Sequence, residues 1–496
     1  MLKLLNFNAF LVLACTSIQI FAASITEDSL LDLAKKGAPQ LDQINAAFYS
    51  AAIQKGQLNE RFAPEFFARG SYAETNERPI LSFFPIWSPI KQGQIGLRKE
   101  LTKGFSAQAA FTADQRTAAT PLSGRLENIT TTALSFTLQM DLWKDLFGRM
   151  TDSQINSMAA QTKRAELERK IQTRAFIISV RRIFWSLVAN QESLKVSEEL
   201  LKSAQTQAQE TNARFRNAVA ESDEVARNEA QVSSRKGSLL YLQYERETLF
   251  KQLKNLLPEL NSQEVQLGNY DLQTAFNNVM ACAGTISSDT KIPYQNTHFD
   301  ETIQLLREIK RHSNIINSKY ASADVKLFGT VKATGVGSDE VKTGLTRGSY
   351  GAAFDDVTNN NRSGYEVGLN VSVPLGGVKQ QTQNSQELYD QKRLDAAIVN
   401  SEAQVISTHQ ELVKSVGLLN QAIAAQKITT EQLKKRLMVM RKKYEQARAS
   451  INEIINDQDA LLNSELSTIQ TRLQLINLLF DYLMIYTETP CPFNRI

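Results

Sequence analysis

The feature that most constrains the fold is a long stretch without helix breakers, from Thr151 to about Ala213, which contains no proline and no glycine. Apolar residues recur there every seven positions, and the second half of the chain repeats that spacing. The positions are Val180, Leu187, Leu194 and Leu201 in the first half and Ile398, Val405, Leu412 and Leu419 in the second. A sustained seven-residue repeat predicts helices that supercoil on a partner. Such a helix would span roughly 95 Å, since each residue adds about 1.5 Å.

Each long helix is interrupted by a short stretch of small and acidic residues, RFRNAVAESDEVARNEAQ at 214–231 and KYEQARASINEIINDQDA at 443–460. The two stretches match position by position when the first residue of one is aligned with the first of the other. The matched pairs are Phe215 with Tyr444, Ala218 with Ala447, Ala220 with Ala449, Glu224 with Glu453 and Val225 with Ile454. The helical pattern then resumes, to about Leu257 and Tyr486. Each half is therefore predicted to contain a helical hairpin with one arm of about 65 residues, a return arm of about 35, and the small-residue stretch at its tip.

The apolar period changes from seven to two before each hairpin. The alternating positions are Phe66 to Tyr72, Ile95 to Leu101, Phe105 to Ala113 and Leu134 to Met140 in the first half, and Val325 to Val331 and Tyr365 to Val373 in the second. A tight turn is expected at 102–104, and long polar loops near 75–92, 115–130 and 337–362. Alternating segments of about ten residues are typical of outer-membrane strands, although a soluble sandwich shows the same pattern.

The N-terminal sequence MLKLLNFNAFLVLACTSIQIFAAS has a lysine, an apolar stretch and then small residues, the layout of a secretory signal peptide. Cleavage is expected after Ala22. A lipoprotein, acylated at Cys15 of LVLAC, stays open as the alternative, and the chain is exported in either case. No later segment has the run of about 18 apolar residues that a transmembrane helix needs. The apolar stretch at 475–486 is short and contains Asp481.

Composition and motifs argue against several classes of function. A net charge of +4 over 496 residues gives no electrostatic footprint for binding nucleic acid. The three histidines, His298, His312 and His409, lie far apart and without metal-ligand spacing, and the chain has no GxxxxGK[ST] phosphate-binding loop. We expect no catalytic, cofactor or metal site, so the chain is predicted not to be an enzyme.

The tips and strands together resemble the TolC-type outer-membrane factors, a family of trimeric channel-tunnels used in drug efflux and type I secretion. VGLNVSVPLGG at 367–377 resembles the family's strand-to-helix "PL" junction. The family tip carries an aromatic residue, a glycine, a small hydroxyl residue, an acid and an aliphatic residue. Phe215, Ala218, Glu221, Glu224 and Val225 fill these places in the first tip, and Tyr444, Ala447, Ser450, Glu453 and Ile454 in the second. The resemblance covers essentially the whole mature chain, with two departures: alanine replaces both glycines, and the first half has an extra hairpin at 93–114.

This resemblance implies an α+β fold in which a trimeric outer-membrane β-barrel continues into a long periplasmic α-helical coiled-coil tunnel. The repeating unit, which occurs twice, is a helix, strands and a long helical hairpin. A homotrimer is expected because one chain has too few strands to close a transport barrel, and open strand edges are not left in lipid. The family builds twelve strands from three chains, and twelve is preferred here to the eighteen that the extra hairpin would give.

The implied function is the passive exit duct of a tripartite efflux pump or type I secretion system, located in the bacterial outer membrane with a large periplasmic part. The expected partners are a periplasmic adaptor (membrane fusion) protein, an inner-membrane pump or ABC exporter, and outer-membrane lipid. The alternative is a periplasmic or surface coiled-coil scaffold without channel activity. The expected segments are a signal peptide at 1–22, a first repeat at 23–257 (strands 65–142, tip 214–225), an irregular joining segment at 258–297, a second repeat at 298–488 (strands 324–375, tip 443–454) and a tail at 489–496.

Three groups of site residues are expected on the same resemblance. The tips are expected to dock the adaptor through Phe215, Ala218, Ala220, Glu221, Tyr444, Ala447, Ala449 and Ser450. Glu453, Asn456 and Asp457 are expected at a periplasmic gate, where Glu453 and Asp457, spaced i, i+4, share a helix face and threefold symmetry makes each acid a ring. Cys282 and Cys491 are expected to form a disulfide in the oxidising compartment. Tight helix turning, a solvated helix face and two free thiols are the respective alternatives.

Overall fold

The structure is a computed structural model and describes residues 23–75, 86–119, 126–262, 265–287, 297–337, 349–359, 362–446 and 448–485. The chain divides into two compact units. The helical unit contains the residues up to Asn45, Lys170–His298 and the residues from Val405 on. The sheet unit contains Ala46–Arg169 and Phe299–Gln404. Each unit therefore takes segments from both halves of the sequence.

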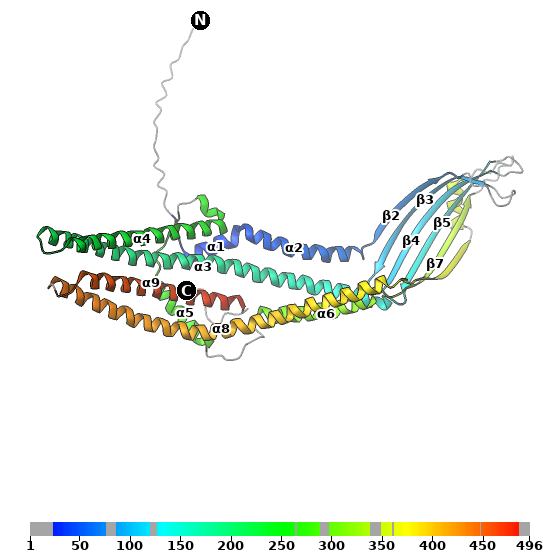
Figure 1. The fold of residues 1–496 in the computed structure, drawn as a ribbon. Helices are drawn as coiled ribbons and strands as arrows, with labels where there is room; N and C mark the ends of the chain where they lie inside the picture. The colour runs from blue at the N-terminus through cyan, green and yellow to red at the C-terminus, as the bar shows by residue number, and fades with distance from the viewer. Residues whose placement is uncertain are drawn as a thin grey trace, which may run out of the picture. The chain divides into compact units, whose positions relative to one another are not determined.

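Two helical hairpins dominate the helical unit (Figure 1). The first consists of α3 (Arg149–Arg216) and α4 (Ser222–Leu256), and the second of α8 (Val378–Glu445) and α9 (Ile451–Ile485). In both hairpins the first helix has 68 residues and the return helix has 35. The first turns of α3 and α8 belong to the sheet unit. Equal arm lengths in the two halves are what an internal duplication would produce.

The seven-residue apolar repeat forms the packed side of the long helices. Val180, Leu187, Leu194, Val405 and Leu412 are buried, and Leu201, Ile398 and Leu419 are half-buried. Removing this surface from water is the main favourable term for a helix of such length, because helix propensity alone contributes little. The repeat read from the sequence therefore identifies the side chains that hold the hairpins together.

Short elements complete the helical unit. They are β1 (Ala23–Ile25), α1 (Glu27–Gly37), the 3₁₀ helix η2 (Pro258–Ser262), β6 (Val265–Leu267) and α5 (Leu272–Ser287). β1 pairs in parallel with β6. Glu192 Oε1 accepts a hydrogen bond from Leu272 N at 2.8 Å, which fixes the start of α5 on α3. Burial raises the pKa of Glu192, as expected for a carboxyl group held between helices. The joining segment, expected to be irregular, thus contains regular elements.

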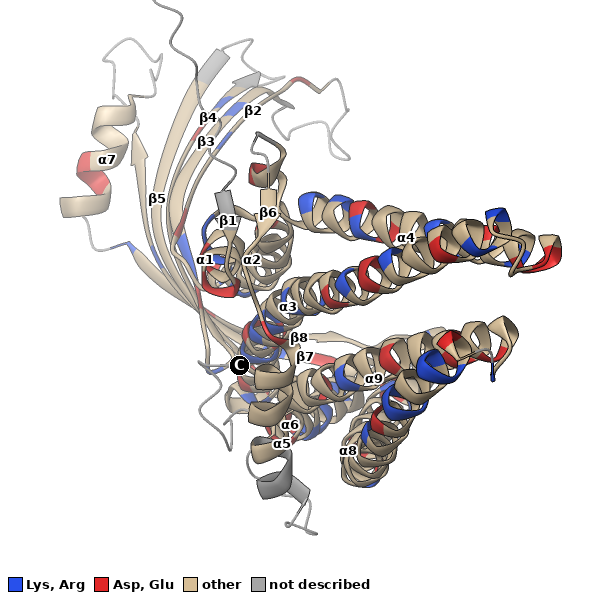
Figure 2. Cartoon of the chain, turned by 90° about the vertical axis from the view of Figure 1, so that its left-hand side faces the viewer, with Lys and Arg blue, Asp and Glu red and all other residues tan. Residues whose placement is uncertain are grey.

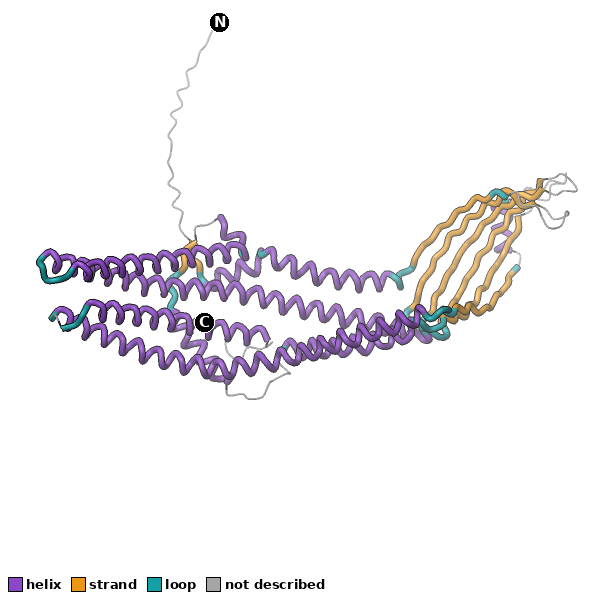
Figure 3. The backbone as a smooth tube through the Cα atoms, in the orientation of Figure 1, coloured by secondary structure: helices purple, strands orange, loops and turns teal. Residues whose placement is uncertain are grey.

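The sheet unit holds a six-stranded antiparallel sheet in the order β2-β3-β4-β5-β7-β8 (Figure 3). The strands are β2 (Glu65–Ala73), β3 (Ile86–Leu101), β4 (Phe105–Ala119), β5 (Leu126–Asp141), β7 (Asp324–Gly337) and β8 (Ser363–Ser372). Helices α2 (Pro39–Glu60), α6 (His298–Tyr320) and α7 (Tyr350–Asn359) precede or link them.

The extra hairpin is an integral part of this sheet. Its strands, β3 and β4, pair with each other and also with β2 on one side and β5 on the other. The described part of one chain therefore has six strands in this sheet, and the preference for twelve strands from three chains, which needs four per chain, is wrong. A hairpin bonded on both sides cannot be left out of the sheet without exposing two rows of unpaired backbone groups.

Several strands run further than the alternating apolar residues. β3 begins at Ile86 and β4 ends at Ala119, inside stretches expected to be polar loops. The pairs Lys91↔Gln115 and Gln92↔Asp114 continue the ladder with polar side chains. Backbone pairing needs no apolar residue, so apolar alternation marks only the part of each strand with an apolar side. The stretch 337–362 likewise contains a helix, α7, and not only loop.

The junction between the sheet and α3 is tightly fitted. Gly104, in the 102–104 turn, and Gly148, at the end of the 3₁₀ turn η1 (Leu146–Gly148), both have positive φ, of 75° and 76°. A Cβ on Gly104 would meet the carbonyl oxygen of Asp145, and one on Gly148 would meet that of Thr102. Buried Asp145 accepts hydrogen bonds from Met150 N at 2.7 Å and Thr151 N at 3.0 Å, so it caps the start of α3.

Candidate functional site: an apolar sheet face and two hairpin tips

The strand register gathers the large apolar side chains of the sheet onto one side. Phe66 pairs with Leu97, Leu97 with Ala109, Ala109 with Phe136, Phe136 with Val331 and Val331 with Tyr365, so one row of this side crosses all six strands. We call this side the apolar face. Its large residues, each at least 40% exposed, are Phe66, Tyr72, Ile95, Leu97, Leu134, Phe136, Leu138, Leu327, Val331, Tyr365, Val367, Leu369 and Val371. An exposed continuous patch of this kind marks a surface that something apolar covers.

The apolar face has a polar border at one end. The row of Lys91, Gln115 and Thr130 is polar, and two rows further on Ile95 begins the apolar part. On β7 the apolar part extends from Ala333, in the row of Ile95, to Val325, about 27 Å at about 3.4 Å per residue. An apolar band of about 25 Å is the pattern of strands in an outer membrane.

The opposite side of the sheet is polar. It carries an exposed ion pair of 2.6 Å between Arg98 and Glu65, and a hydrogen bond of 2.9 Å between the hydroxyls of Thr137 and Thr330. Phe328 lies over Gly368 of the neighbouring strand, where a Cβ would leave no room for the ring. The two sides therefore differ as the lipid side and the water-filled side of a barrel wall differ.

Both edges of the sheet are open in the described part of the chain. β2 has 9 residues and β8 has 10, whereas the four strands between them have 14 to 16. Because six antiparallel strands alternate in direction, β2 and β8 run in opposite directions. A β8 edge of one copy can therefore pair antiparallel with the β2 edge of another.

The two hairpin tips share a backbone hydrogen bond at matching positions. At the first tip, Val219 N donates to Arg214 O at 2.9 Å and Ala218 N to Phe215 O at 2.9 Å, the bonds of a Schellman motif. At the second tip, Arg448 N donates to Lys443 O at 2.8 Å, which is the counterpart of the first of these bonds in the aligned stretch. Ala218 has a φ of 56°, in the left-handed region that glycine prefers. It stands where the family carries glycine, so the backbone keeps the turn although the residue type differs.

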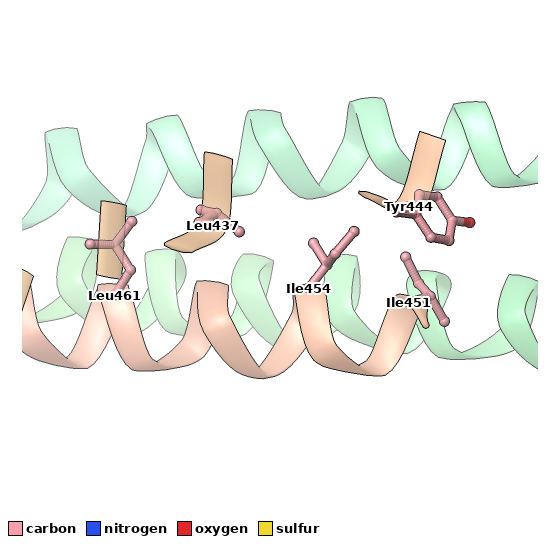
Figure 4. Packing of buried hydrophobic residues seen from close by; sticks show 5 residues of the cluster. All are labelled: Leu437, Tyr444, Ile451, Ile454 and Leu461. Carbon is pink, nitrogen blue, oxygen red and sulfur yellow. The ribbon is translucent and has the colours of Figure 1, made fainter. Parts of the chain in front are cut away.

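The expected docking residues have different surroundings at the two tips. Phe215 is 45% exposed, whereas its counterpart Tyr444 is 8% exposed. Tyr444 packs with Leu437, Ile451, Ile454 and Leu461 between the arms of the second hairpin (Figure 4). Of the other expected docking residues, Ala218, Glu221 and Ser450 are exposed, Ala220 and Ala449 are half-buried, and Ala447 lies outside the described residues.

The expected gate residues do not share one environment. Glu453 is exposed, and its Oε2 accepts from Ser450 N at 2.9 Å, so it stabilises the start of its own helix. Asp457 is 3% exposed and accepts from Arg436 Nε at 3.0 Å across the hairpin. Asn456 is exposed. Glu453 and Asp457 are thus one turn apart but on opposite sides of the boundary between solvent and core.

Contacts between the two hairpins add residues that the sequence reading missed. Buried Arg235 on α4 forms an ion pair with Asp459 on α9, and Gln458 donates to Gln207 at 3.0 Å. The Arg214 guanidinium lies over the Tyr444 ring, 4.6 Å from its centroid. A groove of about 390 Å³ lies beside these contacts, lined by residues that include Glu199, Lys202, Thr206, Arg441 and Glu445. Partners that belong to opposite halves of the sequence leave no local pattern by which to find them.

Other expectations fall on residues that the structure leaves undescribed. Cys15, Cys491 and the side chain of Cys282 are among them, although the backbone at 282 belongs to α5. Within the described ranges, no group of three or more His, Cys, Asp or Glu side chains could hold a metal ion. None of the described helices is long and apolar enough to span a membrane.

Solved structures of outer-membrane proteins, several of them channels, have a fold similar to that of this chain. VceC of Vibrio cholerae matches with a TM-score of 0.62 and 13% identity, covering 93% of this chain and 97% of its own. The Campylobacter jejuni CmeC outer membrane channel matches with a TM-score of 0.61 and 15% identity, covering 98% and 94%. The open state of the Neisseria gonorrhoeae MtrE outer membrane channel matches with a TM-score of 0.56 and 14% identity, covering 94% and 91%.

The chain has the fold of the outer-membrane efflux channels. The resemblance to TolC-type outer-membrane factors, drawn from the tips and the strand-to-helix junction, is thereby confirmed at the level of the fold. No protein-family model matches the chain, and a search of curated proteins finds no match. At 12–15% identity only the arrangement of elements is shared, so function must be argued from the residues of this chain.

Proposed function

We propose that the protein is an outer-membrane channel-tunnel, the passive exit duct of an export system that spans the periplasm. The observation that carries this proposal is the exposed apolar face on a sheet whose other side is polar. A coiled-coil scaffold without channel activity does not require an exposed apolar sheet face. The long hairpins, in this proposal, form the periplasmic tunnel, and the signal peptide at 1–22 directs export.

The open edges β2 and β8 support assembly from several copies. In lipid, unpaired backbone groups cost several kcal/mol each (about the cost of burying an unbonded polar group), so the sheet must close. Three copies, the number taken from the resemblance, would join β8 to β2 three times and bring eighteen strands. A barrel of 16 to 18 strands encloses an aqueous channel.

An exposed apolar stripe on α8 supports the same assembly in the helical part. Leu388, Val399, Leu418, Ile428 and Val439 are each more than half exposed. Leu388, Val399, Ile428 and Val439 are 11, 29 and 11 positions apart, close to three, eight and three helical turns, so they lie near one face of the helix, whereas Leu418 lies about a quarter turn away. A neighbouring copy of the chain would cover this face, as the tunnel of a homotrimer requires.

Fractionation and conductance test the proposal. The full chain, expressed with its own N-terminal segment, should be found in the outer membrane as a heat-modifiable oligomer and should conduct ions in planar bilayers. Glu366→Lys, on the polar side of β8, should change ion selectivity, and Glu411→Lys, an exposed acid of α8 away from the tip, serves as a charge-matched control. A soluble elongated monomer would instead support the scaffold, and a membrane oligomer without conductance would contradict a duct.

We propose further that the tips bind a periplasmic adaptor, which would link the duct to an inner-membrane pump or ABC exporter. Phe215 is the cleanest residue to test, because it is half exposed, whereas a bulky replacement of Ala449 would also strike the apolar cluster of its own hairpin. Phe215→Ala should reduce adaptor crosslinking and export while the oligomer persists. Tyr241→Ala, which removes an exposed aromatic residue of the return helix α4 away from the tip, is the matched control. Unchanged crosslinking in Phe215→Ala would remove this residue from the docking surface.

Glu453, Asn456 and Asp457 remain our proposal for the periplasmic gate. The ion pair with Arg436 partly neutralises Asp457, so Glu453 would supply most of the free negative charge of a ring. Like charges about 8 Å apart cost on the order of 0.5–2 kcal/mol per pair, so such a ring would attract cations. Glu453→Gln together with Asp457→Asn should lower cation selectivity and block by divalent ions in single-channel recordings. Recordings identical to the unmodified channel would place these acids outside the pore.

A further inference from the structure

Helix α7 lies on the apolar face of the sheet. Figure 2 shows it beside β5, on the convex side of the curved sheet. Thr132 Oγ1 donates to Ala353 O at 2.8 Å, and Val336 N donates to Asp356 Oδ2 at 2.8 Å. The Phe354 ring meets Phe111 of β4 edge to face, with centroids 6.0 Å apart. The helix is therefore fixed to the side of the sheet that we propose faces lipid.

The sheet surface under α7 consists of glycine and threonine residues that leave room for the helix. A Cβ on Gly335 would meet the backbone of Ala353 and Val357, and one on Gly337 would meet that of Ser349 and Ala353. Thr130 and Thr132, which share rows with these glycines, are fully buried there. Elsewhere the same face carries large exposed apolar residues, so small and hydroxyl residues mark the part that protein covers.

α7 stands where the apolar face ends. The row that contains Gly337 also contains Thr130, Gln115, Lys91 and Tyr72, so it is mostly polar. Two rows nearer the strand-to-helix junctions, the face becomes apolar, with Phe111 and Leu134. The Phe354 ring contacts Phe111, toward the strand-to-helix junctions, and is nevertheless 51% exposed. Tyr350 is 45% exposed. The helix thus presents aromatic rings at the border between the apolar band and the polar end of the wall.

We propose that α7 is an interfacial helix that seats Phe354 and Tyr350 among the headgroups of the outer leaflet. Tyr350 suits this depth because its ring is apolar and its hydroxyl is polar, and Phe354 adds an apolar ring that contacts Phe111 of the band. Ala353 and Asp356 face the sheet, whereas Asp355, Thr358 and Asn359 are exposed and would face water. The occupant of the exposed aromatic surface is therefore lipid, by continuity with the apolar band. This inference rests on the proposed membrane location of the sheet.

Spin labels measure the depth of α7 directly. The full chain, with Cys15, Cys282 and Cys491 replaced by serine, would be reconstituted in vesicles of phosphatidylethanolamine and phosphatidylglycerol. Single labels would replace Phe354 or Tyr350, with Leu134→Cys as the label in the band and Asn370→Cys as the label on the polar side. The ratio of collisions with oxygen to collisions with a nickel chelate rises with depth. At positions 350 and 354 it should be about threefold above that at 370 and below that at 134, as expected at a membrane border.

The controls separate this inference from the proposed function. If the label at 134 is as accessible to nickel as the label at 370, the sheet is not in lipid and the proposed function itself fails. If the label at 134 is in lipid while the labels at 350 and 354 give the same collision ratio as the label at 370, only the interfacial role of α7 is overturned. If the two α7 labels are shielded from oxygen and nickel alike, protein covers the helix, and lipid as its occupant is wrong. The label at position 350 controls for a folding defect caused by replacing Phe354, because the Tyr350 side chain is not part of the Phe111 contact.

Discussion

The two hairpin tips have matching helix ends and different interiors. Their arms are equal in length, and their turns share a hydrogen bond at matching positions of the aligned stretches. The second tip encloses an apolar cluster of Leu437, Tyr444, Ile451, Ile454 and Leu461. The corresponding residues of the first tip are Ala208, Phe215, Ser222, Val225 and Val232. Smaller or polar residues thus replace four of the five, and the aromatic residue is left half exposed.

The polar contacts between the arms differ in the same places. In the first hairpin, buried Asn228 donates to buried Thr211 at 3.0 Å. Asp457, the counterpart of Asn228, instead pairs with Arg436, and Met440 takes the place of Thr211. A neutral hydrogen bond at one tip corresponds to an ion pair at the other. The duplication has therefore kept helix length and turn, which a tunnel of fixed length requires, while the side chains have diverged.

The largest difference between the tips should appear when each aromatic residue is removed. Tyr444→Ala should destabilise the second tip by about 3 kcal/mol, because it empties a packed site and removes the ring under Arg214. Phe215→Ala should cost less than about 1 kcal/mol, because an exposed ring buries little area. Hydrogen exchange of the two tips in the full oligomer measures both values. Equal protection losses would show that the cluster does not hold the second tip closed.

The ion pair provides the next contrast. Arg436→Gln leaves Asp457 buried without its cation and should destabilise the second tip by about 1–3 kcal/mol, reduced from the cost in a fully buried pair because Arg436 is exposed. The double change Asp457→Asn with Met440→Thr copies the first tip. It should lose less stability than Arg436→Gln and should show no dependence on salt, since it exchanges an ion pair for a neutral bond.

Exchange measured in dilute and concentrated salt checks this prediction. The unmodified second tip should lose protection as salt increases, the first tip should not, and the double variant should behave as the first tip does. Asn228→Ala is the matched control in the first hairpin. Salt dependence that persists in the double variant would mean that Arg436 and Asp457 are not its source.

Sequence periodicity was sufficient to predict the helices and strands that have one apolar side. It was insufficient to predict the elements whose position depends on residues distant in the sequence. The heptads found α3 and α8 because Val180 and Leu412 lie on a continuous apolar stripe. Period-two alternation found the middle of each strand, but not the polar extension at Gln92 and Asp114. It missed α7, because the small residues under that helix, such as Gly335, carry no apolar signal and lie on another element.

The expected gate residues show that sequence spacing also fails to predict the burial of individual side chains. A spacing of i, i+4 correctly places Glu453 and Asp457 one turn apart, yet positions i and i+4 differ by about 40° around the helix. At the edge of a packed stripe this difference separates an exposed acid from a buried one. Which of the two falls on the packed side depends on the other arm, α8, whose Arg436 pairs with Asp457.

The smallest expected effect concerns the turn that the two tips have in common. Ala218 holds a φ of 56°, a conformation that costs an L-residue with a Cβ roughly 1 kcal/mol and glycine almost nothing. Ala218→Gly should therefore stabilise the first tip by about 0.5 kcal/mol, the relief of strain being offset in part by the greater freedom of glycine in the unfolded chain. Ala226→Gly, at an exposed position inside α4, should instead destabilise by about 0.5–1 kcal/mol. Hydrogen exchange at the tip distinguishes the two signs. If both variants destabilise equally, the turn at Ala218 is not strained.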